Sequence, residues 1–339
     1  MIDANPVLAE LTRGNWVENR HRGAFVVIDA KGTIIASAGD IERPIFPRSA
    51  IKSMQALAMA SSGAIDKFAL SDEELALSCA SHHGESFHVA GVTAFLDHLG
   101  LDAASLECGG HAPSFGPARE ALRQHGEPFS ALHNNCSGKH SGMLSVAEAL
   151  GVPTRGYVER HHPVQQAVRA AIEAVVGEPL SEGRCGTDGC SIPTWAAPLR
   201  AFAQGFARMA TGEGLSPDLA TASRRIFDAA TAHPHLVGGT GSLDTDVMRA
   251  FNGRIMQKGG AEGVQCGALR DKGWGYALKV DDGNMAASHA MVATLLLAIA
   301  GPDAAQAAVL ERFATQTIRN VRRLEVGSLQ ATSLMRPSI

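Results

Sequence analysis

Aromatic side chains are scarce in this sequence of 339 residues, at 5%, and long uninterrupted apolar runs are missing. The most apolar stretch, residues 285–300, contains Ser288 and His289 and is shorter than the roughly 20 residues that a membrane-spanning helix needs. The first residues lack the basic region and the apolar core of a secretory signal. We therefore expect a cytoplasmic protein that does not enter a membrane.

Blocks of like charge are also missing. The net charge is −4 and charged residues make up 19% of the chain, without a basic cluster, which argues against nucleic acid as a partner. Hydrophobic residues (45%) and 36 glycines are plentiful, as in a globular protein with many tight turns. In the cytoplasm we expect the six cysteines to be reduced, and to be buried, reactive or metal-binding rather than disulfide-bonded.

Strand-like segments lie at both ends of the chain, and helical patterns fill the middle. The strand-like segments are residues 23–29, 33–39, 254–260, 264–269, 275–281 and 321–326. We predict an α+β fold with α/β/α layers, in which the N- and C-terminal strands form one antiparallel sheet covered by helices. We expect a single domain with an α/β part (1–52 and 236–339) and a mainly helical part (53–235).

The segment Ser49-Ala-Ile-Lys52 opens a helical pattern. A serine and a lysine three residues apart lie on the same face of a helix, so Lys52 can take the hydroxyl proton of Ser49. This is the Ser-x-x-Lys arrangement of the penicillin-recognising serine enzymes, although a capping serine followed by an ordinary lysine would look the same. Ser81 and a later Lys258-Gly-Gly follow in the order of the other elements of those enzymes, with glycine where they carry a hydroxyl residue.

Two groups of potential metal ligands support a second interpretation. Cys136, Lys139 and His140 are close in sequence, as are Asp188 and Cys190, and zinc favours thiolate and imidazole ligands. The spacing is not that of a zinc finger or ribbon, so buried thiols at a loop junction are an alternative. Cys136 acting as a nucleophile with His140 is a third possibility.

The polar segment 133–142 precedes an apolar helical pattern at 143–150. Small polar groups in front of a helix suit an anion or carboxylate site, or a loop that caps the helix. We expect Asn135 and His140 of this segment to contribute to substrate binding, and Arg48 to hold a substrate carboxylate.

Six segments together resemble the rhizobial-type L-asparaginase family, which is distinct from the threonine-dependent asparaginases. They are Pro47–Lys52, Ser81–His88, Cys108–His111, His133–His140, Gly186–Cys190 and Lys258–Gly263. The resemblance implies hydrolysis of L-asparagine to L-aspartate and ammonia by a homodimer with a fold similar to serine β-lactamases. It also implies two Ser–Lys pairs, Ser49 with Lys52 and Ser81 with Lys258.

The same resemblance implies a zinc ion near the catalytic serine, bound by Cys136, Lys139 and Cys190. Asp188 and His140 would lie beside it as substrate-binding residues, and zinc would assist substrate binding rather than activate the attacking group. One departure from the family pattern is His83, where a small residue is expected, and it affects the pocket near Ser81.

Other function classes stay open at this point. Another Ser-x-x-Lys amidohydrolase, of the glutaminase or β-lactam type, would use the same residues. A zinc-dependent amidohydrolase would lose its activity with a chelator. A non-catalytic amino-acid-binding or zinc-binding protein would bind without releasing ammonia.

Overall fold

The computed structural model describes residues 4–339, which divide into two compact units. The sheet unit comprises the chain up to Ala50, Ala197–Ala210 and Asp246–Ile339. The helical unit comprises Ile51–Ala196 and Thr211–Thr245. None of the helices within residues 4–339 combines the length and the apolar character that crossing a bilayer would require.

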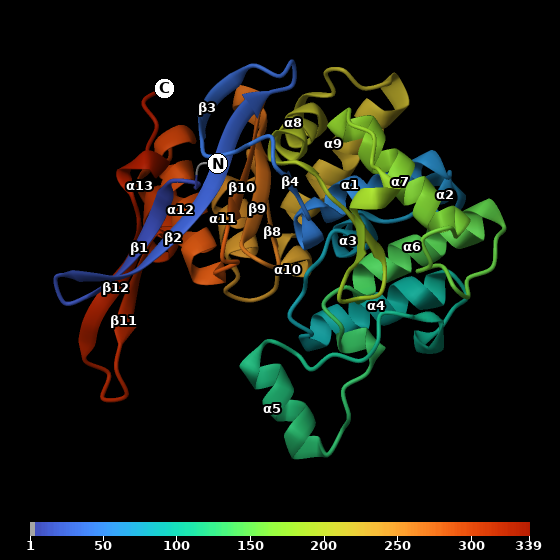
Figure 1. Cartoon of the computed structure of the whole chain (residues 1–339). Helices are drawn as coiled ribbons and strands as arrows, with labels where there is room; N and C mark the ends of the chain where they lie inside the picture. The colour runs from blue at the N-terminus through green and yellow to red at the C-terminus, as the bar shows by residue number, and fades with distance from the viewer. Residues whose placement is uncertain (1–3) are drawn as a thin grey trace. The chain divides into compact units, whose positions relative to one another are not determined.

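The sheet unit contains an eight-stranded sheet within the described residues, and all its strand pairs are antiparallel (Figure 1). In sheet order its strands are β11 (Thr315–Arg319), β12 (Glu325–Ala331), β1 (Val7–Arg13), β2 (Trp16–Asp29), β10 (Trp274–Val280), β9 (Val264–Leu269) and β8 (Ile255–Gly260), with β3 (Ile34–Ala38) paired to β2. The two ends of the chain meet directly, since Ala9 pairs with Ala331. The prediction of an antiparallel sheet built from terminal strands is confirmed.

Helices of the sheet unit cover both faces of this sheet. They include α8 (Leu199–Thr211), α12 (Met285–Ile299) and α13 (Ala304–Ala314). A side chain at Gly275 would collide with the Ala203 carbonyl of α8, so α8 packs directly on that face. Leu278 is three residues further along β10 and therefore points to the other face, as does its cross-strand partner Gln265. Gln265 Nε2 donates to Ser288 Oγ of α12 at 3.0 Å, which gives the predicted α/β/α layering.

The helical unit is built around one buried helix. Its helices are α1 (Lys52–Ser61), α2 (Ala64–Lys67), α3 (Asp72–Ser78), α4 (Ser86–His98), α5 (Gly116–His125), α6 (Ser137–Leu150), α7 (Pro163–Val176), α9 (Pro217–Ala232) and α10 (Pro234–Val237), while α11 (Leu243–Phe251) leads into the sheet unit. Every residue of α1 from Lys52 to Met59 is buried, and α1 contacts α6, α7 and α9. The first residue of this core helix is therefore a lysine without solvent contact.

Some helices follow from local sequence, and others do not. Ser71 caps α3 and forms a capping box with Glu74, three residues later in the sequence. The helix expected from residue 143 begins earlier, because α6 starts at Ser137. Gly138 lies against the Leu77 carbonyl, and a side chain at Gly142 would come 2.6 Å from Ser78 Oγ. These small residues thus pack a helix closely against α3, where the sequence suggested a polar loop.

A further boundary differs from the sequence prediction. The expected strand at 321–326 is mostly a turn, and β12 begins only at Glu325. Trp195 belongs to β6 (Pro193–Trp195), which pairs with β5 (Cys185–Thr187), and α8 begins only at Leu199. The β5–β6 hairpin carries the turn with Asp188 and Cys190.

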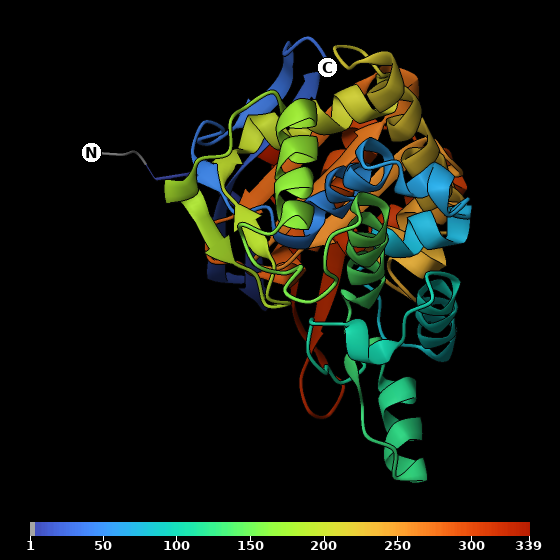
Figure 2. The same ribbon diagram turned by 90° about the vertical axis from the view of Figure 1, so that its right-hand side faces the viewer.

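Helix α5 lies apart from the other helices of its unit in both ribbon views (Figures 1 and 2). None of its residues is buried. Asn134 Nδ2 donates to the carbonyls of Cys108 (2.9 Å) and Gly109 (3.0 Å), so the two ends of the segment that carries α5 are joined at their base. The segment therefore projects from the rest of the helical unit, and hydrogen bonds hold its two ends together where it leaves that unit.

Candidate functional site

Several predicted site residues of the helical unit lie around the amine of Lys52. It is fully buried at the first position of α1. Its Nζ donates to Ser81 Oγ at 2.9 Å and to the Ala80 carbonyl. Cys136 Sγ lies at 3.2 Å and the Asn135 carbonyl at 3.4 Å from the same nitrogen. A serine hydroxyl, a thiol and two carbonyls therefore surround one amine, an arrangement suited to proton transfer at Ser81.

The loop that carries Ser81 is fixed by backbone and histidine contacts. The Ser81 amide donates to the Val237 carbonyl at 2.9 Å, and the His82 amide donates to the Asn135 carbonyl at 3.2 Å. His82 Nε2 lies 2.8 Å from Ser137 Oγ. Burial and nearby positive groups lower the pKa of His82, so its ring is neutral and acts through hydrogen bonds. Ser81 is thus held by groups that do not change charge near neutral pH.

The sheet unit places the turn of Ser49 beside the strand of Lys258. A side chain at Gly260 of β8 would come 2.7 Å from the Pro47 carbonyl oxygen and 2.8 Å from the Ala50 amide nitrogen. The glycine therefore permits β8 to touch the turn on both sides of Ser49. Lys258 is buried on the same strand, and its Nζ donates to the Gly259 carbonyl at 2.8 Å.

Arg48 and Ser49 lie in a single 3-10 turn, Arg48–Ile51, that continues into α1. Arg48 has a φ of 52°, in the left-handed region that residues other than glycine rarely adopt. Such strain persists where the surrounding structure requires it, and is frequent at functional sites. Ser49 lies in this turn, three residues before Lys52 at the start of α1, which is the spacing of the Ser-x-x-Lys motif.

Cys136, Lys139 and Cys190 form a buried cluster in the helical unit. Cys136 is the residue that precedes α6, and Lys139 lies in the first turn of this helix. Lys139 Nζ donates to Cys190 Sγ at 2.9 Å. Cys190 comes two residues after Asp188 in the turn of the β5–β6 hairpin. In this turn the Asp188 amide donates to the Ile192 carbonyl at 2.8 Å. A helix start and a hairpin turn thus bring the two predicted groups of ligands together.

The two thiols of this cluster differ strongly in acidity. A hydrogen bond from Cys136 and the charge of Lys139 lower the pKa of Cys190 to about 5, although burial opposes the shift. The same hydrogen bond and burial raise the pKa of Cys136 to about 12. Burial alone would lower the pKa of Lys139, but the charges of Cys136, Cys190 and Asp188 raise it above its ordinary value. Cys190 is therefore the thiolate, and the protonated Cys136 is a poor nucleophile.

The cluster suits a zinc ion in its chemistry. Cys190 is a thiolate, which zinc favours, whereas Cys136 and Lys139 would have to lose a proton to bind a metal, and lysine is an unusual zinc ligand. Three protein ligands would leave one position open. Across residues 4–339, no three His, Cys, Asp or Glu side chains form such a group. The donor set proposed from the sequence is of a different kind, because its third member is Lys139.

His140 follows the cluster on α6 and is fully buried. Its Nδ1 lies 2.6 Å from the hydroxyl of Tyr157. Burial and the charge of Lys139 lower the pKa of His140 to about 3, so the ring is neutral. The sequence did not single out Tyr157, which stands in a loop without a motif and is one of two tyrosines in the chain.

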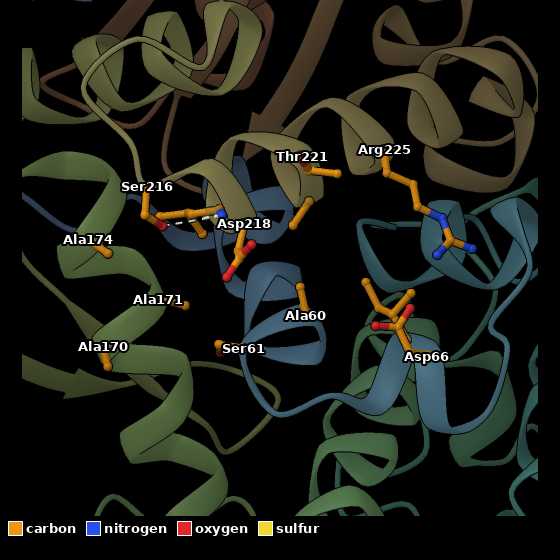
Figure 3. A pocket seen from close by; sticks show the side chains of 13 residues that line it. Ala60, Ser61, Asp66, Ala170, Ala171, Ala174, Ser216, Asp218, Thr221 and Arg225 are labelled. Atoms are coloured by element: carbon orange, nitrogen blue, oxygen red, sulfur yellow. Dashed lines mark hydrogen bonds between the residues drawn. The ribbon is translucent and has the colours of Figure 1, made fainter.

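A large surface cavity of about 770 Å³ lies elsewhere in the helical unit (Figure 3). It is bounded by α1, α2, α7 and α9, and Ala60 and Ser61 at the end of α1 face Asp218 across it. The predicted catalytic, binding and metal residues do not line it. The cavity is therefore separate from the candidate site around Lys52.

Solved structures similar to this chain come from several proteins. A native crystal structure of Mglu has 14% identity and a TM-score of 0.44, over 86% of this chain and 64% of the Mglu chain. A β-lactamase from Mycobacterium bovis has 13% identity and a TM-score of 0.38, over 77% of this chain and 88% of its own. Simvastatin synthase from Aspergillus terreus, in a mutant form, has 12% identity and a TM-score of 0.35, over 76% and 86%.

The comparison with protein families gives a different result. The family model described as L-asparaginase II matches residues 9–331, which is nearly the whole chain. No curated protein sequence matches this chain.

Proposed function

The chain belongs to the L-asparaginase II family and is an asparaginase-type amidohydrolase, and from this premise we propose that it hydrolyses L-asparagine to L-aspartate and ammonia. The proposed mechanism uses Ser49 as nucleophile and Lys52 as its base. The family supports the amide chemistry. The substrate is what the resemblance of the sequence motifs implies, and the mechanism is our inference from the residues of those motifs.

The observation that carries the proposal is the position of Lys52. This buried amine lies three residues after Ser49 and donates to Ser81 Oγ at 2.9 Å. A neutral lysine in this place could take a proton from one serine hydroxyl and pass it through the other. Such a relay is what an amide hydrolysis through a serine ester requires.

In the first step Ser49 Oγ attacks the side-chain amide carbon of asparagine while its proton moves to Lys52. The carbonyl oxygen gains negative charge in the tetrahedral intermediate, where backbone amides such as that of Ser49 could donate to it. The C–N bond then breaks, the leaving nitrogen takes the proton, and ammonia departs. An ester between Ser49 and the aspartyl group remains.

In the second step a water molecule attacks the ester carbon and Ser49 leaves as its hydroxyl. Ser81 and Lys258 would accept the proton of the water and return one to Ser49 Oγ. The close approach of Gly260 to the turn of Ser49 supports a role for Lys258, which lies two residues earlier on β8. The products are L-aspartate and the restored enzyme.

The α-amino and α-carboxylate groups of the substrate need partners of opposite charge. We assign the carboxylate to Arg48 and the amino group to Asp188, with Asn135 and His140 as further binding residues. The position of Asn135 supports its role as a binding residue. Its backbone carbonyl accepts from both Lys52 and the His82 amide, so Asn135 lies beside the candidate site around Lys52. His83, which departs from the family pattern, would shape the pocket beside Ser81.

Cys136, Lys139 and Cys190 would hold the zinc ion that the family resemblance implies. When bound, zinc would supply positive charge that assists binding of the substrate through its carboxylate or carbonyl oxygens. Asp188 and His140 would lie in its surroundings. We also propose that the protein is a cytoplasmic homodimer, which analytical ultracentrifugation and cell fractionation would test.

Ammonia release from L-asparagine and L-glutamine, measured with purified wild type and Ser49→Ala, tests the proposal. We expect asparagine to be the better substrate and Ser49→Ala to lose turnover while its thermal melting stays unchanged. Full activity of Ser49→Ala would transfer the nucleophile to Ser81. A wild type that hydrolyses neither amide but hydrolyses nitrocefin would contradict the asparaginase assignment in favour of a β-lactam substrate.

A further inference from the structure

The hydroxyl of Tyr157 stands between a hydrogen-bond donor and a histidine. The Glu107 backbone amide donates to Tyr157 Oη at 3.1 Å. His140 Nδ1 lies 2.6 Å from the same oxygen. Tyr157 and His140 are both fully buried, so water does not replace either contact.

These contacts decide where the protons lie. Burial raises the pKa of Tyr157, so the hydroxyl keeps its proton. One lone pair of the oxygen accepts the Glu107 amide, and within residues 4–339 the acceptor within reach of the hydroxyl proton is His140 Nδ1. A neutral imidazole that accepts at Nδ1 carries its proton on Nε2.

The Nε2–H group of His140 is a buried hydrogen-bond donor. It has no hydrogen-bond partner among the described residues. Buried donors are almost always paired in native structures, so an unpaired one needs an explanation such as a ligand. His140 directly follows Lys139 at the start of α6, which puts the ring among the residues of the candidate site.

We propose that Tyr157 is a positioning residue that holds His140 as its Nε2–H tautomer, so that His140 donates a hydrogen bond to an oxygen of the bound amino acid. The inference rests on the proposed function for the identity of that ligand. The tautomer itself follows from the contacts of Tyr157. A carboxylate or carbonyl oxygen fits the donor, whereas a metal ion would need a bare nitrogen.

The surroundings of Tyr157 indicate that its position is fixed. Glu107 also accepts the Gly156 amide through Oε1 at 2.8 Å, so one residue holds both the hydroxyl and the adjacent backbone. Gln165 Nε2 donates to the Tyr157 carbonyl at 2.8 Å. A tyrosine held at its backbone and at its hydroxyl can impose one orientation on the histidine ring.

The first test reads the tautomer directly. Long-range ¹H–¹⁵N spectra of protein labelled at histidine, assigned with His140→Gln, should show wild-type His140 protonated at Nε2 with Nδ1 bare. In Tyr157→Phe the Nδ1-protonated form should become populated. The matched control is Tyr276→Phe, which removes the buried hydroxyl that donates to Gln257 Oε1 at 2.7 Å and should leave the His140 signals unchanged.

The second test separates positioning from general damage to the fold. We expect Tyr157→Phe to lower kcat/KM for L-asparagine about five- to tenfold, as for one lost hydrogen bond. Glutamine at position 140 offers an amide donor near the place of Nε2 without needing Tyr157. Adding Tyr157→Phe to His140→Gln should therefore cause no further loss, and an equal loss in both backgrounds would show a merely structural role.

Three outcomes would overturn the proposal: a wild-type His140 protonated at Nδ1, a Tyr157→Phe variant with an unchanged tautomer, or loss of the Nε2–H form when zinc is added. The spectra require no turnover. A protein with the expected tautomer but without ammonia release would contradict the proposed function alone. A shift of the Nε2–H signal on addition of L-aspartate would support the donor role even in that case.

Discussion

Lys52 Nζ lies 3.2 Å from Cys136 Sγ, so the proposed base of the reaction touches a proposed zinc ligand. Cys190, by contrast, contacts Lys139 of the cluster. The two cysteines should therefore differ in their effect on catalysis, although both belong to the same cluster.

We expect Cys136→Ser and Cys190→Ser to lose bound zinc alike, measured as metal per chain by mass spectrometry. Cys136→Ser should lower kcat further than Cys190→Ser does, because it also changes the surroundings of Lys52. The half-buried Cys185 lies outside the cluster, and Cys185→Ser should keep both zinc and activity. Equal kcat values in the two cluster variants would contradict the link between Lys52 and Cys136.

Removal of zinc with a chelator should raise KM for L-asparagine severalfold and leave most of kcat. The reason is that Ser49 and Lys52 carry the proposed chemistry, and zinc assists binding. Initial rates over a range of asparagine concentrations, with chelator and after readdition of zinc, measure the two constants separately. Complete loss of kcat on chelation would favour a zinc-dependent hydrolase instead.

Gly260→Ala should lower activity about a hundredfold, with a destabilisation of about 1–3 kcal/mol from overpacking. The added methyl would come 2.7 Å from the Pro47 carbonyl and 2.8 Å from the Ala50 amide, so the turn of Ser49 must shift. A misplacement of about 1 Å can cost a hundredfold in rate. The control is Gly116→Ala, where a side chain meets nothing within 4 Å. Unchanged kcat/KM in Gly260→Ala would separate this turn from catalysis.

The free energy of unfolding should fall in mild acid because of buried histidines. Burial lowers the pKa of His88 to about 4, and its Nε2 donates to the His235 carbonyl at 2.9 Å. Because the folded-state pKa lies below the unfolded value, the unfolded state binds the proton first as the pH falls. The stability that neutral His88 contributes is present above about pH 6.5 and is lost towards pH 4, on the order of 3 kcal/mol.

Urea unfolding at several pH values measures this slope. His88→Gln should reduce it, since glutamine does not titrate, and the exposed His125→Gln should leave it unchanged. A slope that is the same in wild type and in His88→Gln would assign the acid sensitivity to other groups.

Features that depend on neighbouring residues in sequence were predicted well. Strand β9 has the bounds, Val264–Leu269, that its sequence predicted, and the strand expected at 254–260 is β8, Ile255–Gly260. The terminal strands were found because their alternation is local, although β1 was missed, since its sequence carries mixed polar and apolar residues. The pairing of β1 with β12 stabilises it through partners more than 300 residues away.

Features that depend on tertiary packing could not be read in advance. The start of α6 is set by the contacts of Gly138 and Gly142 with α3, and an isolated sequence shows these residues only as loop formers. Tyr157 has no motif around it, and its meaning comes from His140 and Glu107, which are distant in sequence. The Ser-x-x-Lys motif pointed to Ser49 and Lys52, but the contact of Lys52 with Cys136 required the structure.

The hydrogen bonds from Asn134 to Cys108 and Gly109 indicate where the chain can tolerate an insertion or a deletion. The segment beyond that junction carries α5, which buries no residue, so insertions or deletions there remove little packing. Doubling the length of a flexible loop costs only about 0.6 kcal/mol in closure entropy. The segment is therefore a place where a reporter or a second domain can be inserted while Cys136, two residues after the junction, stays in position.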